Sequence, residues 1–412
     1  MTADADAVPV TSRRGLPLVL AATAISAASS FVILLIVAPA LGPAGYASFS
    51  VFWAALFMLV GVLFGVQQEA TRAVADAVPR DTSRRGASLV HFAVVLGGGA
   101  LAILAATGPL WAEPVFGAGH TVWAFPLAIA VASYVGVAAV NGVLAGSANW
   151  SGFALVPLVD GVSRLVLVGI VLLTGADTTA LCWAVAVPFP LSLVVVALFW
   201  RSGIARHSVV GESYGRLTAN VARTVVASAA NAVLVNGFPV VLALFGGGDR
   251  AALGAVVLAL TLTRAPILVP LTALQSMLIT RFSASSRSAS IRFALLLIGC
   301  LAVFTAFAAF LAALCGEAVF AWLFGDGFAL DGMLLGFLVG ASGCLGVLTV
   351  TGASVLAAKR HTVFATGWVL ACVLSVVLVA VFPGDIGTRT VAGLIGGPLI
   401  GASWHAAFGW RR

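Results

Sequence analysis

The sequence predicts an all-α polytopic membrane protein with twelve transmembrane helices. Of its 412 residues, 61% are hydrophobic and 8% are charged. Charged residues make up about 25% of an average soluble domain, so a water-soluble globule is excluded. The charges are also clustered, and long segments such as 15–68 and 114–159 carry none. An apolar stretch of about 20 residues is long enough to cross the bilayer core as a helix.

Apolar runs bounded by Gly, Pro or charged residues define the twelve predicted spans. The first uncharged stretch is too long for one span, and Leu41-Gly42-Pro43-Ala44-Gly45 supplies a turn that makes it a helical hairpin. The spans cover, in chain order, residues 16–40, 46–67, 88–110, 121–145, 152–174, 179–200, 222–245, 251–280, 292–315, 331–356, 362–382 and 390–410.

The distribution of positive charge predicts the orientation of the chain. Seventeen of the 21 Lys and Arg residues fall on the side that holds both termini, whereas only Arg250 and Arg389 fall in the loops of the other side. Because cytoplasmic loops are enriched in Lys and Arg, we expect both termini to be cytoplasmic. The expected location is the cell inner (plasma) membrane, in multi-pass form.

The longest polar connection follows the sixth span and predicts two halves. Residues 1–200 would form an N-terminal lobe with spans one to six, and residues 221–412 a C-terminal lobe with spans seven to twelve. Residues 201–220 would be a cytoplasmic linker. A division into two six-helix halves is common in transporters.

Several functions are disfavoured by the composition. The single lysine, Lys359, stands in Ala-Ala-Lys-Arg-His, so the chain has no P-loop for ATP. The arginines occupy short gaps between apolar runs and do not form a solvated basic face, so no nucleic-acid partner is expected. The five histidines lack the clustered spacing of a metal site. We therefore expect no metal and no cofactor.

An enzymatic role is also disfavoured. The predicted outer loops are too short for the large external domain of a glycosyltransferase or polysaccharide polymerase. A membrane protease would need a nucleophile such as Ser342, in Gly340-Ala341-Ser342-Gly343, and a histidine such as His361 or His405. In a chain with 45 glycines, such small-residue runs are typical of helix-packing surfaces. No catalytic residue is expected, and a membrane-embedded glycan-modifying enzyme is the less favoured alternative.

Three charged residues fall inside predicted spans. Asp160 and Arg164 lie four residues apart in the fifth span, hence on one helix face, and Arg264 lies in the eighth span. A central Arg costs about 2.5–3.5 kcal/mol on insertion scales, so each needs a partner or a wet cavity. One interpretation is a structural network in which Asp160 neutralises the arginines. The other is an anion site, because two arginines exceed one carboxylate and guanidinium groups bind phosphate oxygens bidentately.

Polar residues near these charges are further candidates for substrate binding. Asn231, Asn236 and Pro239 are expected to interrupt the seventh span, and Thr261, Thr263, Pro266, Pro270 and Gln275 the eighth. Interrupted helices often line transport sites, although polar residues also join helices to one another. At the cytoplasmic end of the second span, Glu69 and Arg72 are three residues apart. They would form either a gate between the halves or an interfacial ion pair.

Three segments resemble polysaccharide flippases of the Wzx type, which belong to the multidrug/oligosaccharidyl-lipid/polysaccharide (MOP) superfamily. The segments are Leu41-Gly42-Pro43-Ala44-Gly45-Tyr46-Ala47-Ser48-Phe49-Ser50, Glu69-Ala70-Thr71-Arg72 and Asp160-Gly161-Val162-Ser163-Arg164. The resemblance implies two six-helix lobes around a central cationic cavity that opens alternately to each side of the membrane.

The resemblance also implies a substrate. A polyprenyl-diphosphate-linked oligosaccharide would pass from the cytoplasmic to the outer leaflet for cell-surface polysaccharide biosynthesis, with its lipid tail left in the bilayer. Membrane lipid, and a glycan polymerase or glycosyltransferases, would be partners. Arg164 and Arg264 would attract the diphosphate, and Asp160 would hold Arg164 or take part in ion coupling. The main alternative is a cation-coupled multidrug exporter of the same superfamily, for which Asp160 is the available acidic group.

Overall fold

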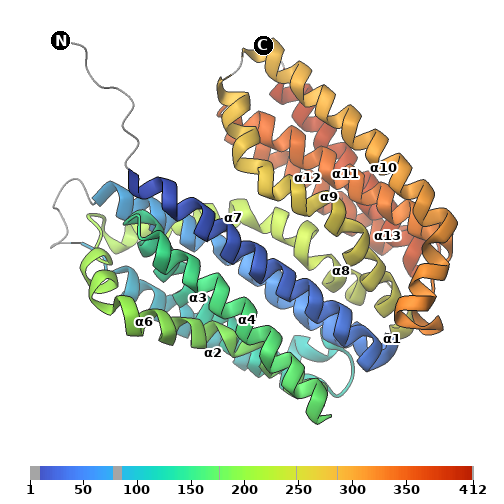
Figure 1. The fold of residues 1–412 in the computed structure, drawn as a ribbon, viewed down its shortest axis with the longest axis horizontal. Coiled ribbons are helices and arrows are strands. Elements are labelled where there is room, and N and C mark those ends of the chain that lie inside the picture. Colours follow the sequence, from blue (N-terminus) through green and yellow to red (C-terminus); the bar gives the residue numbers. More distant parts are fainter. Residues whose placement is uncertain (1–9, 78–85, 176, 247, 285, 411–412) are drawn as a thin grey trace. The chain divides into compact units, whose positions relative to one another are not determined.

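The computed structural model describes residues 10–77, 86–175, 177–246, 248–284 and 286–410, and these residues are largely helical (Figure 1). Across this part of the chain, the β pairing is one isolated bridge between Ser88 and Val209. The α-helices are α1 (Val10–Ala77), α2 (Leu89–Phe116), α3 (Ala124–Gly146), α4 (Trp150–Thr174), α5 (Thr178–Ala186), α6 (Pro188–His207), α7 (Tyr214–Ala232), α8 (Phe238–Phe245), α9 (Arg250–Ala284), α10 (Arg287–Phe324), α11 (Gly332–Ala357), α12 (His361–Val381) and α13 (Ile386–Trp404).

The helices confirm the predicted polytopic membrane fold. Within the described ranges, eleven helical segments are long and apolar enough to cross a membrane. The first of them, Pro17–Ala77, has 61 residues and contains a break, so it is long enough for two crossings, in agreement with the twelve predicted spans. Two other segments join short helices: α5 with α6, and α7 with α8 through the π-helix Val233–Gly237.

The break in α1 lies at the predicted turn. Gly42 has φ 66° and ψ 173°, a left-handed backbone conformation that glycine adopts at little cost. Both arms of α1 reach α4: Ser26 packs closely against Gly161, and the Phe57 ring lies 5.2 Å from the Arg164 guanidinium. Since positions 161 and 164 are one turn apart, α1 must fold back on itself between Ser26 and Phe57. The predicted hairpin is therefore confirmed.

The eighth span corrects one expectation. Pro266 and Pro270 were expected to interrupt it, but both lie inside the continuous helix α9. Thr261 and Thr263 also bond carbonyls of their own helix, at 2.8 and 3.3 Å. Transmembrane helices tolerate proline because neighbouring groups and small local adjustments satisfy the freed carbonyls, whereas a full break would expose more of them to the membrane.

The chain forms two compact units. The first unit contains the described residues up to Val37 together with Ala55–Ala232, and the second contains Ala38–Ala54 together with the residues from Val233 onward. The division into lobes at residues 201–220 stays a prediction. These residues contain the end of α6, a short segment paired with the start of α2, and the start of α7.

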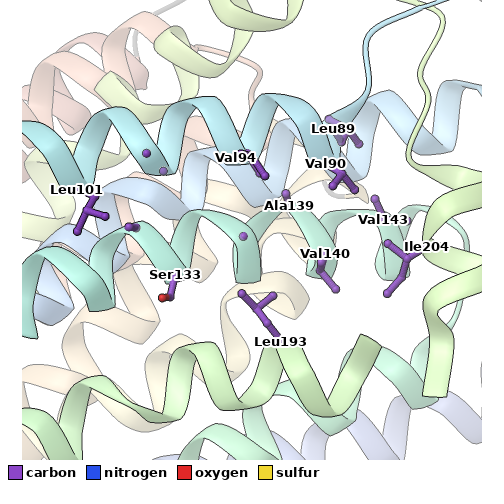
Figure 2. Close-up of a pocket in the computed structure, with 15 residues that line it drawn as sticks. Leu89, Val90, Val94, Leu101, Ser133, Ala139, Val140, Val143, Leu193 and Ile204 are labelled. Atoms are coloured by element: carbon purple, nitrogen blue, oxygen red, sulfur yellow. The ribbon is translucent and has the colours of Figure 1, made fainter. Parts of the chain in front are cut away.

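In the first unit, α2 packs on α3, and α6 packs on α3 and α4. Side chains of α2, α3 and α6 surround an apolar cavity of about 390 Å³, in which Ser133 is the polar side chain (Figure 2). Val90 and Val94 beside it are 44% and 67% exposed, as expected of helix faces that contact lipid. The predicted site residues do not line this cavity.

In the second unit, α10 packs on α11, α11 also packs on α9 and α13, and α12 packs on α13. The Tyr46 ring, from the turn region of α1, stacks edge-on against Phe328 with centroids 5.9 Å apart. Glycines allow several of these close approaches. At Gly254, for example, an added Cβ would collide with the Pro43 backbone.

Candidate functional site

Arg164 lies in α4 of the first unit, and its side chain is 1% exposed. Its Nη2 donates to Oδ1 of Asp160, one turn earlier on the same helix, and its Nε donates to the Val185 carbonyl at 3.2 Å. The rings of Phe57 and Phe189 lie 5.2 and 4.9 Å from the guanidinium carbon, within cation–π range. The structure thus brings Asp160 and Arg164 together as their spacing predicts.

These contacts fill one edge of the Arg164 guanidinium. Nε and Nη2 point their hydrogens in the same direction, and this is the edge that can bind two oxygens side by side. In Arg164 one position of the edge holds a carboxylate and the other a carbonyl. The carbonyl of Val185 lies at the end of α5 (Thr178–Ala186). Arg164 is therefore a paired, buried charge.

Arg264 lies in α9 of the second unit and is 8% exposed. Its Nη1 donates to the Val235 carbonyl at 3.1 Å, and its guanidinium carbon lies 5.6 Å from the centre of the Phe238 ring. Its Nε and Nη2 are buried and have no hydrogen-bond partner among the described residues. The edge that Arg164 fills is thus unpaired in Arg264; we call it the open edge, in the sense that it has no hydrogen-bond partner among the described residues, although both nitrogens are buried.

The chain conformation around Val235 explains this arrangement. Pro239 has no N–H, so the Val235 carbonyl, four residues earlier, has no α-helical donor. The backbone forms the π-helix Val233–Gly237 at this point, and Arg264 supplies a donor to the carbonyl. The predicted interruption of the seventh span is confirmed. Single π-helical turns inside longer helices are frequent at functional sites.

The predicted amides are placed as follows. Asn231 lies in the last turn of α7, and Asn236 lies in the π-helix next to Val235; both are partly buried. Gln275 falls within α9, but its side chain lies outside the described residues. A role of these three residues in substrate binding stays a prediction, as it does for Asp160, Arg164 and Arg264.

Glu69 and Arg72 form an ion pair within the first unit. Arg72 Nε donates to Oε2 of Glu69 at 2.9 Å, and Nη2 donates to the other carboxylate oxygen, so the pair is bidentate. Arg72 also contacts Asp76 at 2.8 Å and Glu212 at 2.8 Å. The Glu69 side chain is 5% exposed, whereas that of Arg72 is 42% exposed. A gating role for this pair stays a prediction.

Sequence reasoning missed several of these partners. Glu212 lies 140 residues from Arg72, and no local pattern marks it. It is placed by the segment that follows α6: the backbone of Ala87 donates to the Glu212 carbonyl at 2.8 Å, and the Val210 N–H donates to Ala87 at 3.0 Å. The Val235 carbonyl was also missed, although Pro239 four residues later is a usable signal for a carbonyl without a donor.

Ser342 and His405, two residues of the alternative protease interpretation, each bond other groups in the structure. Ser342 is buried in α11 and donates to the Leu338 carbonyl at 2.9 Å. The ring of His405 contacts the Thr351 hydroxyl at 3.2 Å and the Phe364 carbonyl at 3.1 Å instead. Within the described ranges, no group of three His, Cys, Asp or Glu side chains is placed to hold a metal ion.

Comparison with curated proteins finds uncharacterised mycobacterial relatives. A protein of Mycobacterium bovis and one of Mycobacterium tuberculosis are each 32% identical over 263 residues, which is 63% of this chain and 61% of the relative. A second M. tuberculosis protein is 32% identical over 265 residues, or 64% of this chain and 61% of the relative. The chain thus spans about three fifths of the length of the curated relatives it matches. No family model matches the chain.

Comparison with solved structures finds transporters rather than enzymes. An inward-facing multidrug resistance transporter of the MATE family, within the MOP superfamily, aligns with a TM-score of 0.69, 16% identity, and 95% and 93% coverage of the two chains. The outward-facing conformation of a MATE-family transporter aligns with a TM-score of 0.64 and 15% identity, over 97% of this chain and 94% of that chain. A MOP-superfamily transporter from Pyrococcus furiosus aligns with a TM-score of 0.64 and 16% identity, over 97% of this chain and 94% of that chain. That transporter is described as having a binding pocket of reverse polarity. The chain therefore has the fold of the MOP-superfamily membrane transporters.

Proposed function

We propose that this chain is a membrane transporter that flips a polyprenyl-diphosphate-linked oligosaccharide from the cytoplasmic to the outer leaflet by alternating access. The observation that carries the proposal is the open Nε/Nη2 edge of Arg264. The fold supports transport in general, and the open edge supports an anionic substrate group. Cell-surface polysaccharide biosynthesis is the proposed process, with glycosyltransferases or a glycan polymerase as partners.

The chemistry of the open edge favours a phosphate oxygen pair. An unpaired charge inside a membrane span is costly, so a residue that keeps two N–H groups without partners needs a functional reason. Two parallel N–H groups match the spacing of two oxygens on a phosphate or carboxylate. Arg264 has its third nitrogen, Nη1, bound to Val235, which fixes the direction in which the edge points.

Asp160 and Arg164 have a different proposed role. Because they satisfy each other, Arg164 offers the substrate less free binding capacity than Arg264. We propose that the pair holds α4 against α5, and that Arg164 binds the diphosphate only when Asp160 is protonated. That step would couple transport to an ion gradient. Asn231, Asn236 and Gln275 are proposed to bind the sugar or phosphate through their amides.

A cation-coupled multidrug exporter is the second candidate. The buried carboxylate of Asp160 and the fold shared with a multidrug resistance transporter favour it. A cationic drug would need an acidic site, and Asp160 would have to release Arg164 to provide one. The two candidates thus differ in which unit carries the critical residue: Arg264 for the flippase and Asp160 for the exporter.

Vesicle transport measurements test the proposal. Purified protein is reconstituted with a fluorescent polyprenyl-diphosphate-linked oligosaccharide, and its arrival in the opposite leaflet is measured with a membrane-impermeant quencher. Loss of two charge-assisted hydrogen bonds in Arg264→Met is expected to slow flipping by about 100-fold. The matched control is Arg389→Met, which removes a partly buried arginine that also donates to backbone carbonyls. Flipping at the wild-type rate by Arg264→Met would overturn the proposal, and gradient-driven export of a cationic dye that needs Asp160 would favour the exporter.

A further inference from the structure

A pocket rich in positive charge lies at one end of the second unit, in contrast to the apolar cavity of the first unit. It has a volume of about 310 Å³ and lies where α9 and α11 end and where α10 and α12 begin. Its polar lining side chains are Ser283, Arg287, Ser290, Ser354, Arg360 and Trp410. Arg264 does not line it, so this pocket is separate from the proposed transport residue.

No Asp or Glu is among the residues that line the pocket. Residues 251–316, 332–384 and 386–412 contain no Asp or Glu, and these stretches include every lining residue. Glu317, the acidic residue of α10, lies 30 positions after Arg287, which is about 45 Å along a helix. Three further basic residues, Arg281, Arg292 and Lys359, lie at the same helix ends.

The backbone adds to the positive character. Arg287 is the first residue of α10, and Arg360 directly precedes α12. Helix starts carry a partial positive charge and N–H groups that lack helical partners. The start of α10 is capped by the Ser286 hydroxyl at 3.4 Å, whereas α12 has no side-chain cap. The start of α12 therefore adds partial positive charge beside Arg360.

The walls of the pocket are held by hydrogen bonds. Arg360 Nη1 donates to the Phe408 carbonyl at 2.6 Å, which fixes the side chain at the pocket. The Trp410 indole donates to the Ser354 hydroxyl at 3.1 Å, and the Ser290 hydroxyl donates to Phe282 at 3.0 Å. The pocket thus joins a fixed guanidinium and a second arginine, and it lies beside the start of α12.

We propose that this pocket binds a phosphate group, independently of the transport site. The source is either the headgroup of an anionic lipid or a phosphate compound in solution. A ring of basic residues at the ends of membrane helices, with a tryptophan among them, is suited to an anionic headgroup. A bound phosphate would link the ends of these four helices of the second unit.

Binding measurements on the full chain test this proposal and separate the two sources. The protein is placed in phosphatidylcholine nanodiscs with or without phosphatidylglycerol, and pyrophosphate is titrated in a third arm. Arg287→Gln and Arg360→Lys are compared with Arg292→Gln, a matched control at the same helix end outside the pocket lining. Loss of one charge-assisted contact in Arg287→Gln is expected to weaken binding about tenfold. Arg360→Lys keeps the charge and is expected to weaken binding less.

The outcomes are distinct. A loss confined to phosphatidylglycerol identifies a lipid headgroup, and a loss confined to pyrophosphate identifies a soluble ligand; both support the site. The proposal is overturned if Arg287→Gln binds both phosphatidylglycerol and pyrophosphate as well as wild type does. It is also overturned if Arg292→Gln loses as much binding as Arg287→Gln. Thermal unfolding in phosphatidylcholine alone checks that the variants are folded. Arg264→Met is expected to leave binding unchanged, so failure here is distinguishable from failure of the proposed function.

Discussion

Arg164 in the first unit and Arg264 in the second are both buried, yet they differ in what fills the Nε/Nη2 edge. In Arg164 the edge holds Asp160 and the Val185 carbonyl. In Arg264 both nitrogens lack a hydrogen-bond partner in the part of the chain that the structure describes. Both guanidinium groups also lie near aromatic rings and contact one helix carbonyl. The two buried arginines thus differ in how the Nε/Nη2 edge is paired, and not in charge.

The largest effect is expected from breaking the Asp160–Arg164 ion pair in the first unit. Arg164→Met leaves the Asp160 carboxylate buried without its partner and is expected to reduce the free energy of unfolding by about 3–5 kcal/mol. Arg264→Met removes a charge that has no acidic partner among the described residues, so a change below about 1.5 kcal/mol is expected. Chemical unfolding in detergent, followed by circular dichroism, measures both. Recovery of stability in Asp160→Leu/Arg164→Met is the control, and equal losses in the two single variants would contradict the comparison.

A third arginine extends the comparison to the end of α1. Glu69 fills the Nε/Nη2 edge of Arg72 from a nearly buried position, whereas Glu212 reaches the same side chain from a more exposed one. We expect Glu69→Gln to cost about 1.5–3 kcal/mol. Glu212→Gln is expected to cost less than about 1 kcal/mol, because exposed ion pairs contribute little. Thermal unfolding of both variants in low and high salt measures the difference, and a larger loss in Glu212→Gln would be inconsistent with it.

The sequence is sufficient to predict most of the fold. In a membrane, each span must satisfy its own backbone hydrogen bonds, so apolar length and Gly or Pro breaks determine the helix limits. The turn at Gly42 and the break before Pro239 were predicted for this reason. The predicted break in α9 is wrong, because proline lowers helix propensity but does not force a helix to end when its surroundings are apolar.

The candidate site was harder to predict. Spacing alone placed Asp160 next to Arg164, because residues four apart on a helix face the same direction. The contact between Arg264 and Val235 joins two helices and depends on how they pack, which no local pattern encodes. The same holds for Glu212, whose position depends on pairing with the start of α2.

Restoring a backbone donor sharpens the comparison between the two arginines. In Pro239→Ala the new N–H can donate to the Val235 carbonyl, so it competes with Arg264 Nη1. The guanidinium would lose the contact that fixes its direction, and flipping is expected to slow about tenfold while the charge is kept. Vesicle flipping measures this change, with Pro398→Ala in α13 as the matched proline control. Equal rates in Pro239→Ala and wild type would show that the Val235 contact does not position Arg264.

The smallest expected effect concerns Asp385, a carboxylate of the second unit. Asp385 precedes α13 and accepts a hydrogen bond from the Thr388 N–H at 2.8 Å; hydrogen bonding by Thr388 lowers the pKa of its carboxyl group below the usual 3.8. The ionised cap stabilises the fold above that usual value, and its contribution is lost as the pH falls through the lowered pKa. Asp385→Ala is therefore expected to cost about 1 kcal/mol at neutral pH, with the difference from wild type shrinking in acid. Asp385→Asn keeps a capping side chain that does not titrate, so its stability should lack this pH dependence.

Flipping by Asp385→Ala should match the wild-type rate, because this carboxylate caps a helix and does not pair with Arg264. A slower rate would mean that the open edge of Arg264 depends on this carboxylate.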